Sequence, residues 1–186
     1  MNHSDHLGLL RPAVPALILD RAPTWADIGA GDGAFTLALA DLLGPGASIV
    51  AVDRDRGALA ANARSMAAAF PQTNLTTLVA DFRSLPAGAL PELDGIVAAN
   101  SLHFVPRSDH PAVIAALAGH LRPGARFVVV EYDADHGNTW VPHPFSASAW
   151  PALATAAGLV SAHVTGRVPS RFLGAIYSAF AHRPGE

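Results

Sequence analysis

The sequence predicts an α/β fold in which a doubly wound, seven-stranded sheet lies between two layers of helices, a three-layer αβα sandwich. Between residues 25 and 130, short apolar runs alternate with alanine-rich stretches, and each run ends at a polar or glycine cluster. This pattern is typical of parallel strands that helices cover on both faces. Only residues 166–171 separate the last two apolar runs. That is too few for a helical crossover, so the seventh strand is expected to run antiparallel.

The elements follow in order along the chain. Continuously apolar residues predict strands at 25–28, 48–52, 75–80, 95–99, 126–131, 159–165 and 172–180. Helices are expected at 34–43, 57–70, 109–121 and 146–157. A further helix should precede the first strand, beginning around residues 11–15 and ending before Pro23. Asp109 is the expected N-cap of its helix, and Pro71, Pro123 and Gly124 should mark helix ends.

Composition limits the chemistry that this chain can perform. Its 186 residues suffice for one domain with a full core, and none of them is cysteine. All 12 basic residues are arginines. Mechanisms that need cysteine or lysine are therefore excluded, among them Schiff bases, phosphate-loop lysines and the Tyr-Lys pair of short-chain dehydrogenases.

The same composition bears on location, partners and domain organisation. No apolar run approaches the ~20 residues of a membrane-spanning helix, and residues 1–10 do not resemble a secretory signal, so we expect a cytoplasmic protein. The net charge of -3 disfavours nucleic acid as a partner. We expect one domain, 1–186, with an N-terminal helical extension (1–22), a cofactor-binding core (23–131) and a substrate-side loop, helix and hairpin (132–186).

A glycine loop closes the first strand and opens the helix that follows. Residues 29–34 satisfy the G-x-G-x-x-G/A fingerprint, and Asp53 comes about 20 residues later, where a ribose-binding acid is expected. Both a nicotinamide dinucleotide and S-adenosylmethionine need such an acid. Asp27 and Asp32 bracket the loop and would repel a pyrophosphate, whereas a sulfonium cation tolerates them. S-adenosylmethionine is therefore favoured, with an NAD(P)-binding oxidoreductase as the alternative.

Over residues 23–180 the sequence resembles the class I S-adenosylmethionine-dependent methyltransferases. Five motifs occur in the family's order: the glycine segment 27–33, the acid that ends 49–53, the Asp-Phe pair 81–82, the segment 100–103 and the entry to the fifth strand at 121–124. The resemblance implies S-adenosylmethionine as cofactor and the strand order 3-2-1-4-5-7-6. It also implies the cofactor-binding residues, which are Asp27, Gly29, Ala30, Gly31 and Gly33 for the methionine part, Asp53 for the ribose, Asp81 and Phe82 for the adenine, and Asn100 and Ser101 beside the methyl group. Arg54 is a further expected cofactor-binding residue.

Candidate substrate-side residues come from the loops that share this rim of the sheet. The loop 132–145 is dense in aromatic and imidazole groups, and loops on a rigid scaffold often carry binding residues. The candidate catalytic residues are His103, Tyr132 and His136, and the candidate substrate-binding residues are Trp140, His143 and Arg171. A structural role would equally explain four of them: packing for Trp140, a turn for His143, an ion pair for Arg171 and a place after the fourth strand for His103. The histidines and carboxylates match no established metal-ligand spacing, so no metal is expected.

The predicted function is methyl transfer by in-line displacement to an oxygen, nitrogen or sulfur atom of a small molecule. Positioning supplies much of the acceleration in such a reaction, so a general base is optional. A non-catalytic module that binds S-adenosylmethionine is a second alternative, although the intact glycine motif and Asp53 count against it. No inserted cap is readable in the sequence. The small pocket is therefore expected to be closed by residues 1–22 or by a second copy in a homodimer.

Overall fold

The computed structural model describes residues 1–15, 21–86, 88–170 and 172–185, and within these ranges the strands form one seven-stranded sheet. Its order is β3-β2-β1-β4-β5-β7-β6. The strands are β1 (Thr24–Ile28), β2 (Ser48–Asp53), β3 (Asn74–Val79), β4 (Leu93–Ala99), β5 (Leu121–Tyr132), β6 (Val160–Pro169) and β7 (Ala175–His182). The pairs from β3 to β5 are parallel, and β7 is antiparallel to both neighbours. The predicted fold class, strand order and reversed seventh strand are confirmed.

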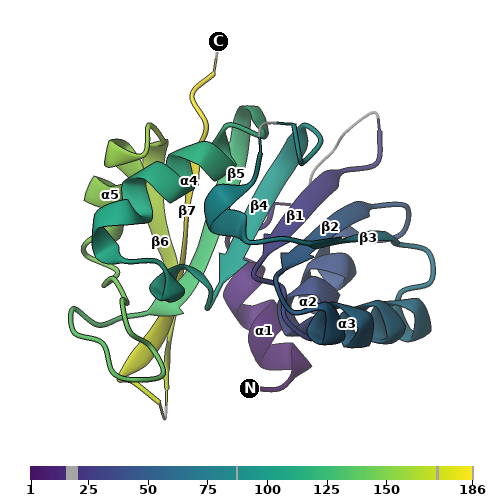
Figure 1. The fold of residues 1–186 in the computed structure, drawn as a ribbon, viewed down its shortest axis with the longest axis horizontal. Helices are drawn as coiled ribbons and strands as arrows, with labels where there is room; N and C mark the ends of the chain where they lie inside the picture. The colour runs from purple at the N-terminus through teal and green to yellow at the C-terminus, as the bar shows by residue number, and fades with distance from the viewer. Residues whose placement is uncertain (16–20, 87, 171, 186) are drawn as a thin grey trace.

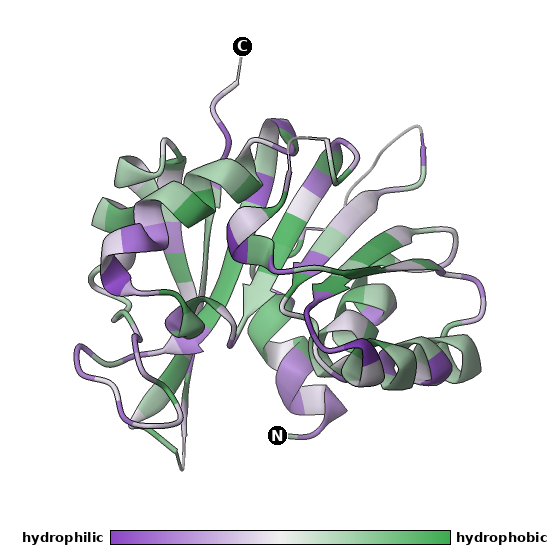
Figure 2. Cartoon of the chain, viewed as in Figure 1, coloured by the Kyte–Doolittle hydropathy of each residue, from purple (hydrophilic) through white to green (hydrophobic). Residues whose placement is uncertain are grey.

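Helices cover both faces of this sheet (Figure 1). Within the described ranges they are α1 (His3–Leu10), α2 (Ala34–Leu43), α3 (Arg56–Ala69), α4 (His110–Ala118) and α5 (Trp150–Ala156), with short 3-10 turns η1 (Phe82–Ser84), η2 (Leu102–Phe104) and η3 (Arg107–Asp109). The buried side chains form two main cores. One contains residues of α1, α2 and α3, and the other contains residues of α4 and α5. Figure 2 shows the apolar character concentrated along the central strands that both cores share.

The N-terminal helix begins and ends earlier in the chain than the sequence predicts. α1 begins at His3, because Asn2 and Asp5 form a reciprocal capping box, and it ends at Leu10, before Pro12. Residues 11–14 form turns, and residues 16–20 of the expected helix lie outside the described residues. α1 packs against α2 and β7 and buries Leu9 and Leu10 in the core that it shares with them. The N-terminal segment therefore belongs to the core.

Several other boundaries differ from the sequence-based prediction. Pro123 and Gly124 do not end α4, which stops at Ala118; instead they lie in an irregular stretch of β5, where Gly124 has φ +76°. The register between β4 and β5 shifts at this point, which accommodates the extra residues. Asp109 occupies the N-cap position of α4, but its side chain makes no capping hydrogen bond. α5 is shorter than expected and begins only at Trp150.

The winding of the chain determines where a ligand can bind. β1 pairs with both β2 and β4, so the strand order reverses beside it. α2 and α3, which follow β1 and β2, pack on one face, and α4, which follows β4, packs on the other. The loops after β1 and β4 therefore diverge at the carboxyl ends of these strands, and open α/β sheets bind ligands in the crevice between such loops.

Candidate functional site

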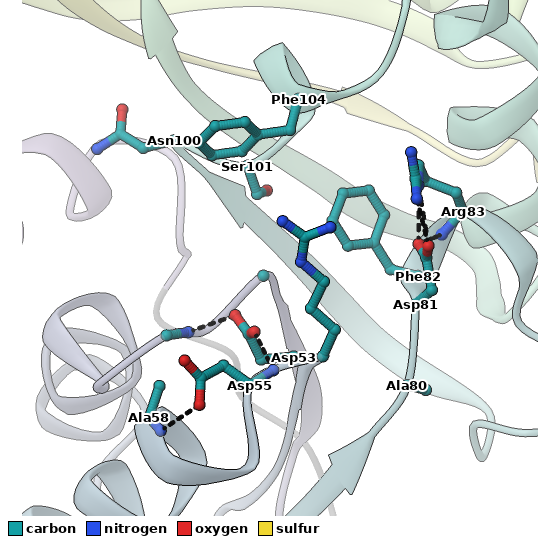
Figure 3. Close-up of a pocket in the computed structure, with 13 residues that line it drawn as sticks. Asp53, Asp55, Ala58, Ala80, Asp81, Phe82, Arg83, Asn100, Ser101 and Phe104 are labelled. Atoms are coloured by element: carbon teal, nitrogen blue, oxygen red, sulfur yellow. Dashed lines mark hydrogen bonds and ion pairs between the residues drawn. The ribbon is translucent and has the colours of Figure 1, made fainter. Parts of the chain in front are cut away.

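A cavity of about 420 Å³ opens at the carboxyl ends of β1, β2, β3 and β4 (Figure 3). Eight of the residues predicted to bind a cofactor line it: Gly29, Gly31, Asp53, Arg54, Asp81, Phe82, Asn100 and Ser101. The remaining lining residues were not predicted from the sequence; they are Asp55, Ala58, Ala80, Arg83 and Phe104. The volume of the cavity lies in the range of small-molecule sites.

The glycine loop can line the cavity because its backbone adopts conformations that suit glycine. Gly29 and Gly31 have φ +73° and +54°, in the left-handed region. A Cβ on Gly29 would lie 2.4 Å from Cβ of Ser101, whereas one on Gly31 would meet no atom within 4 Å. The first glycine therefore permits close packing of the turn after β4. The second leaves open space beside the backbone of the loop.

Asp53, the last residue of β2, is held by two backbone groups at the cavity wall. Its Oδ2 accepts a hydrogen bond from the Gly31 N–H at 2.9 Å, and its Oδ1 accepts one from the Asp55 N–H at 2.8 Å. Asp55 in turn caps α3 by accepting hydrogen bonds from the N–H groups of Gly57 and Ala58. Each oxygen of Asp53 keeps a further lone pair. A carboxylate fixed in this way is suited to accept hydrogen bonds from a pair of neighbouring hydroxyl groups.

Across the cavity, Asp81 and Phe82 follow β3 and form a second polar and aromatic wall (Figure 3). The guanidinium of Arg83 donates to the Asp81 carboxylate, with Nε 2.9 Å from Oδ1 and 3.0 Å from Oδ2. These hydrogen bonds lower the pKa of Asp81, so the carboxylate is ionised at neutral pH. The sequence contained a signal for Arg83, because a basic residue two positions after an expected binding acid can reach it.

Two oxygen atoms at the β4 end of the cavity are buried without a hydrogen-bond partner among the described residues. They are Oδ1 of Asn100 and Oγ of Ser101. Both residues line the cavity, and Asn100 has φ +51°, which is unusual for a residue other than glycine. Buried polar atoms are usually hydrogen-bonded, so these two oxygens are suited to receive polar groups of a ligand.

Three predicted cofactor-binding residues, Asp27, Ala30 and Gly33, do not line the cavity. Asp27 lies in β1 at 1% exposure, and its Oδ2 accepts a hydrogen bond from Thr36 Oγ1 at 2.6 Å. Burial raises the pKa of Asp27 to about 7, despite the opposing effect of the Thr36 hydrogen bond. Asp27 thus stands behind the glycine loop, in the core.

Two predicted catalytic residues, His103 and Tyr132, are buried behind the cavity wall. Nδ1 of His103 lies 2.9 Å from Oε1 of Glu131, and the His103 ring packs edge-on against Tyr132 with ring centroids 5.7 Å apart. His103 is 3% exposed and Tyr132 is 9% exposed. Burial raises the pKa of the Tyr132 hydroxyl, which stays protonated at neutral pH. Neither residue lines the cavity.

The remaining predicted residues lie on the loop after β5 or outside the described residues. Trp140 is 80% exposed, His136 is exposed and His143 is half-buried. None of the three lines the cavity, and Arg171 is outside the described residues. Their proposed roles at a substrate site stay predictions. In the described part of the chain, no group of three or more histidines and carboxylates is arranged to hold a metal ion, and no helix is long and apolar enough to cross a bilayer.

The lining residues fit S-adenosylmethionine, the cofactor that the sequence resemblance implies. Asp53 offers oxygen acceptors for a ribose diol, Asp81 and Phe82 offer an acceptor and an aromatic surface for adenine, and the orphaned oxygens lie on the β4 side. The lining carries three carboxylates, those of Asp53, Asp55 and Asp81, and two guanidinium groups, those of Arg54 and Arg83, of which Arg83 is paired with Asp81.

Comparison with known proteins gives the same picture. The sequence profile described as "Methyltransferase domain" matches residues 26–124. An S-adenosylmethionine-dependent methyltransferase from Methanosarcina mazei superposes with a TM-score of 0.68 at 18% identity, over 90% of this chain and 95% of that one. Magnesium protoporphyrin IX methyltransferase from Synechocystis gives 0.71 at 17% identity, over 97% and 77%. An O-methyltransferase family 2 protein from Planctomyces limnophilus gives 0.68 at 17% identity, over 95% and 56%. Among curated proteins, none matches the chain.

Proposed function

Because this chain belongs to the family of S-adenosylmethionine-dependent methyltransferase domains, we propose that it transfers the methyl group to a small-molecule acceptor. The family assignment decides against the NAD(P)-dependent oxidoreductase. The observation that carries the small-molecule proposal is the net charge of -3, which disfavours a nucleic-acid acceptor, since the cavity of about 420 Å³ is assigned to the cofactor. An acidic chain is a poor partner for nucleic acid, whose phosphates it repels.

The geometry supports specific roles for the lining residues. Asp53 would hold the ribose hydroxyls, with its own orientation fixed by the N–H groups of Gly31 and Asp55. Asp81 would accept a hydrogen bond from the adenine amino group while Phe82 packs on the ring. S-adenosylmethionine supplies a methyl group that its sulfonium already activates towards nucleophiles. The protein then has to bind the two reactants, orient them and exclude water. Such positioning lowers the activation free energy by roughly 7 to 11 kcal/mol in well-oriented reactions.

The acceptor atom is an oxygen, a nitrogen or a sulfur in this proposal. The lining residues on the β4 side, Asn100, Ser101 and Phe104, carry no ionisable side chain. An acceptor that binds there as a thiolate or an ionised hydroxyl needs no proton acceptor from the protein. His103 and His136 stay predictions for a proton-accepting role with acceptors that arrive protonated, and Tyr132 stays a predicted catalytic residue without that role.

Binding of S-adenosylhomocysteine tests the cofactor assignment. Asp53→Ala is expected to weaken this binding, measured by calorimetry, by about 2 to 4 kcal/mol, because it removes two charge-assisted hydrogen bonds. Asp41→Ala, which changes a carboxylate on α2 that pairs with His3 and does not line the cavity, is the matched control and should bind like the unsubstituted chain. Equal affinity of the Asp53 variant would refute its assignment.

A methyl-transfer screen tests the acceptor class. The protein is incubated with radiolabelled S-adenosylmethionine and with metabolite, protein and RNA fractions in parallel. Label that enters the metabolite fraction supports a small-molecule acceptor. Label that enters only protein or RNA would overturn the proposal, while leaving the family assignment intact.

A further inference from the structure

A buried carboxylate stands directly behind the wall of the cavity. Glu131, the second-last residue of β5, is 1% exposed. Its Oε1 accepts from the Tyr132 N–H at 2.7 Å, its Oε2 accepts from the His103 N–H at 3.2 Å, and Nδ1 of His103 lies 2.9 Å from Oε1. A carboxylate between two backbone donors is an acceptor, so the hydrogen bond to His103 assigns the ring proton to Nδ1. Three donors therefore converge on one side chain.

The segment that Glu131 holds is the turn after β4, which forms part of the cavity wall. His103 is the middle residue of η2, and two residues of this turn, its N-cap Ser101 and its last residue Phe104, line the cavity. Ser101 packs so tightly against Gly29 that a Cβ on Gly29 would lie 2.4 Å from Cβ of Ser101. A displacement of η2 would therefore move Ser101 and disturb the glycine loop at the same time.

Glutamine has nearly the shape of glutamate but cannot replace it at this position. Its amide has one acceptor oxygen, and its NH2 group is a donor. With three donors around it, a glutamine side chain would leave at least one of them unpaired and would set its own NH2 group against an N–H. The arrangement requires two acceptor oxygens, which only a carboxylate supplies there.

We propose that Glu131 is a positioning residue for cofactor binding: through His103 it holds the turn that presents Asn100, Ser101 and Phe104 to the cavity. The inference rests on the proposed assignment of this cavity to S-adenosylmethionine. In this role His103 acts through its Nδ1–H as a hydrogen-bond donor. Nε2 of His103, which has no hydrogen-bond partner among the described residues, is not required.

Three variants, Glu131→Gln, His103→Asn and His103→Leu, test the proposal by calorimetry with S-adenosylhomocysteine. In His103→Asn the side-chain nitrogen takes nearly the place of Nδ1, so this variant keeps the donor to Glu131 and loses Nε2. His103→Leu loses both nitrogen atoms. Titrations are made at a temperature where circular dichroism shows each variant to be folded, because a role in stability alone would then leave Kd unchanged.

We expect Glu131→Gln and His103→Leu to raise Kd by about tenfold or more, the equivalent of losing one hydrogen bond to a charged group. His103→Asn should stay within about threefold of the unsubstituted chain. Unchanged Kd in Glu131→Gln overturns the proposal, and so does a His103→Asn variant that binds as weakly as His103→Leu. If Glu131→Gln does not fold, the two His103 variants decide the question between them. An unsubstituted chain that does not bind S-adenosylhomocysteine would refute the assignment of the cavity, and this inference with it.

Discussion

Asp27→Asn is expected to stabilise the protein increasingly as the pH rises from 5 to 8. Asp27 is fully buried in β1, and its pKa is raised from 3.8 to about 7, mainly by burial and also by the charge of Asp53. In the unfolded chain this carboxyl group ionises near its ordinary pKa. Between about pH 4 and pH 7, therefore, the folded state holds a proton that the unfolded state has released.

The sign and size of the effect follow from this difference in bound protons. Because the folded state binds more protons, the contribution of Asp27 lowers the free energy of unfolding as the pH rises through this window, and the loss is complete above the folded-state pKa. Each pH unit contributes about 1.4 kcal/mol, so the interval from pH 5 to pH 7 contributes roughly 2 to 3 kcal/mol. Asparagine does not ionise, and its amide oxygen can still accept the hydrogen bond from Thr36.

The assay is urea unfolding of both proteins at pH 5, 6, 7 and 8. The free energy of unfolding of Asp27→Asn, relative to the unsubstituted chain, should grow by roughly 2 to 3 kcal/mol across the series and level off above pH 7. His6, His110 and His182 have lowered pKa values and oppose the trend, because their contribution to stability is lost as the pH falls. These histidines are present in both proteins, so their contributions cancel in the difference between the two free energies of unfolding. Parallel pH profiles for the two proteins would refute the burial argument.

Two further predictions concern packing. Gly29→Ala should weaken S-adenosylhomocysteine binding in calorimetry, because its Cβ would lie 2.4 Å from Cβ of Ser101 at a residue with φ +73°. Normal affinity of the Gly29→Ala variant would contradict the packing argument. Trp150→Ala should lower the free energy of unfolding by about 3 to 5 kcal/mol in urea, because it empties a core position and removes the hydrogen bond from Nε1 to the Phe180 carbonyl. A loss below about 1 kcal/mol would show that α5 does not anchor this core.

Much of the fold could be predicted because the burial pattern is regular. The parallel strands are covered on both faces, so their sequences are apolar throughout and stand out between polar loops. The first and last residues of the helices were less predictable. The capping box of Asn2 and Asp5 was a readable signal for α1, but the prolines at 12 and 15 suggested a later start. Pro123 and Gly124 looked like helix terminators, yet β5 accommodates them in an irregular stretch beside β4.

The candidate site also contains residues that could be predicted from the sequence and residues that could not. The glycine loop, Asp53 and the pair at 81–82 follow directly after strands, so their order along the chain places them at one edge of the sheet. Residues that act through a neighbour were not predictable in this way. Glu131 reads in the sequence as the charged end of a strand, and nothing there shows that its carboxylate turns inward to His103.

By itself the sequence determined the class of fold, the reversed last strand and the identity of the cofactor, because these depend on local periodicity and on short motifs at strand ends. The tertiary structure decided which side chains meet. Asp53 binds the loop at Gly31, 22 residues away, and Glu131 binds His103, 28 residues away. Such contacts depend on strand register and on the depth of burial. Burial raises the pKa of Asp27. His103 is also buried, behind the cavity wall, whereas the sequence predicted that it faces the substrate.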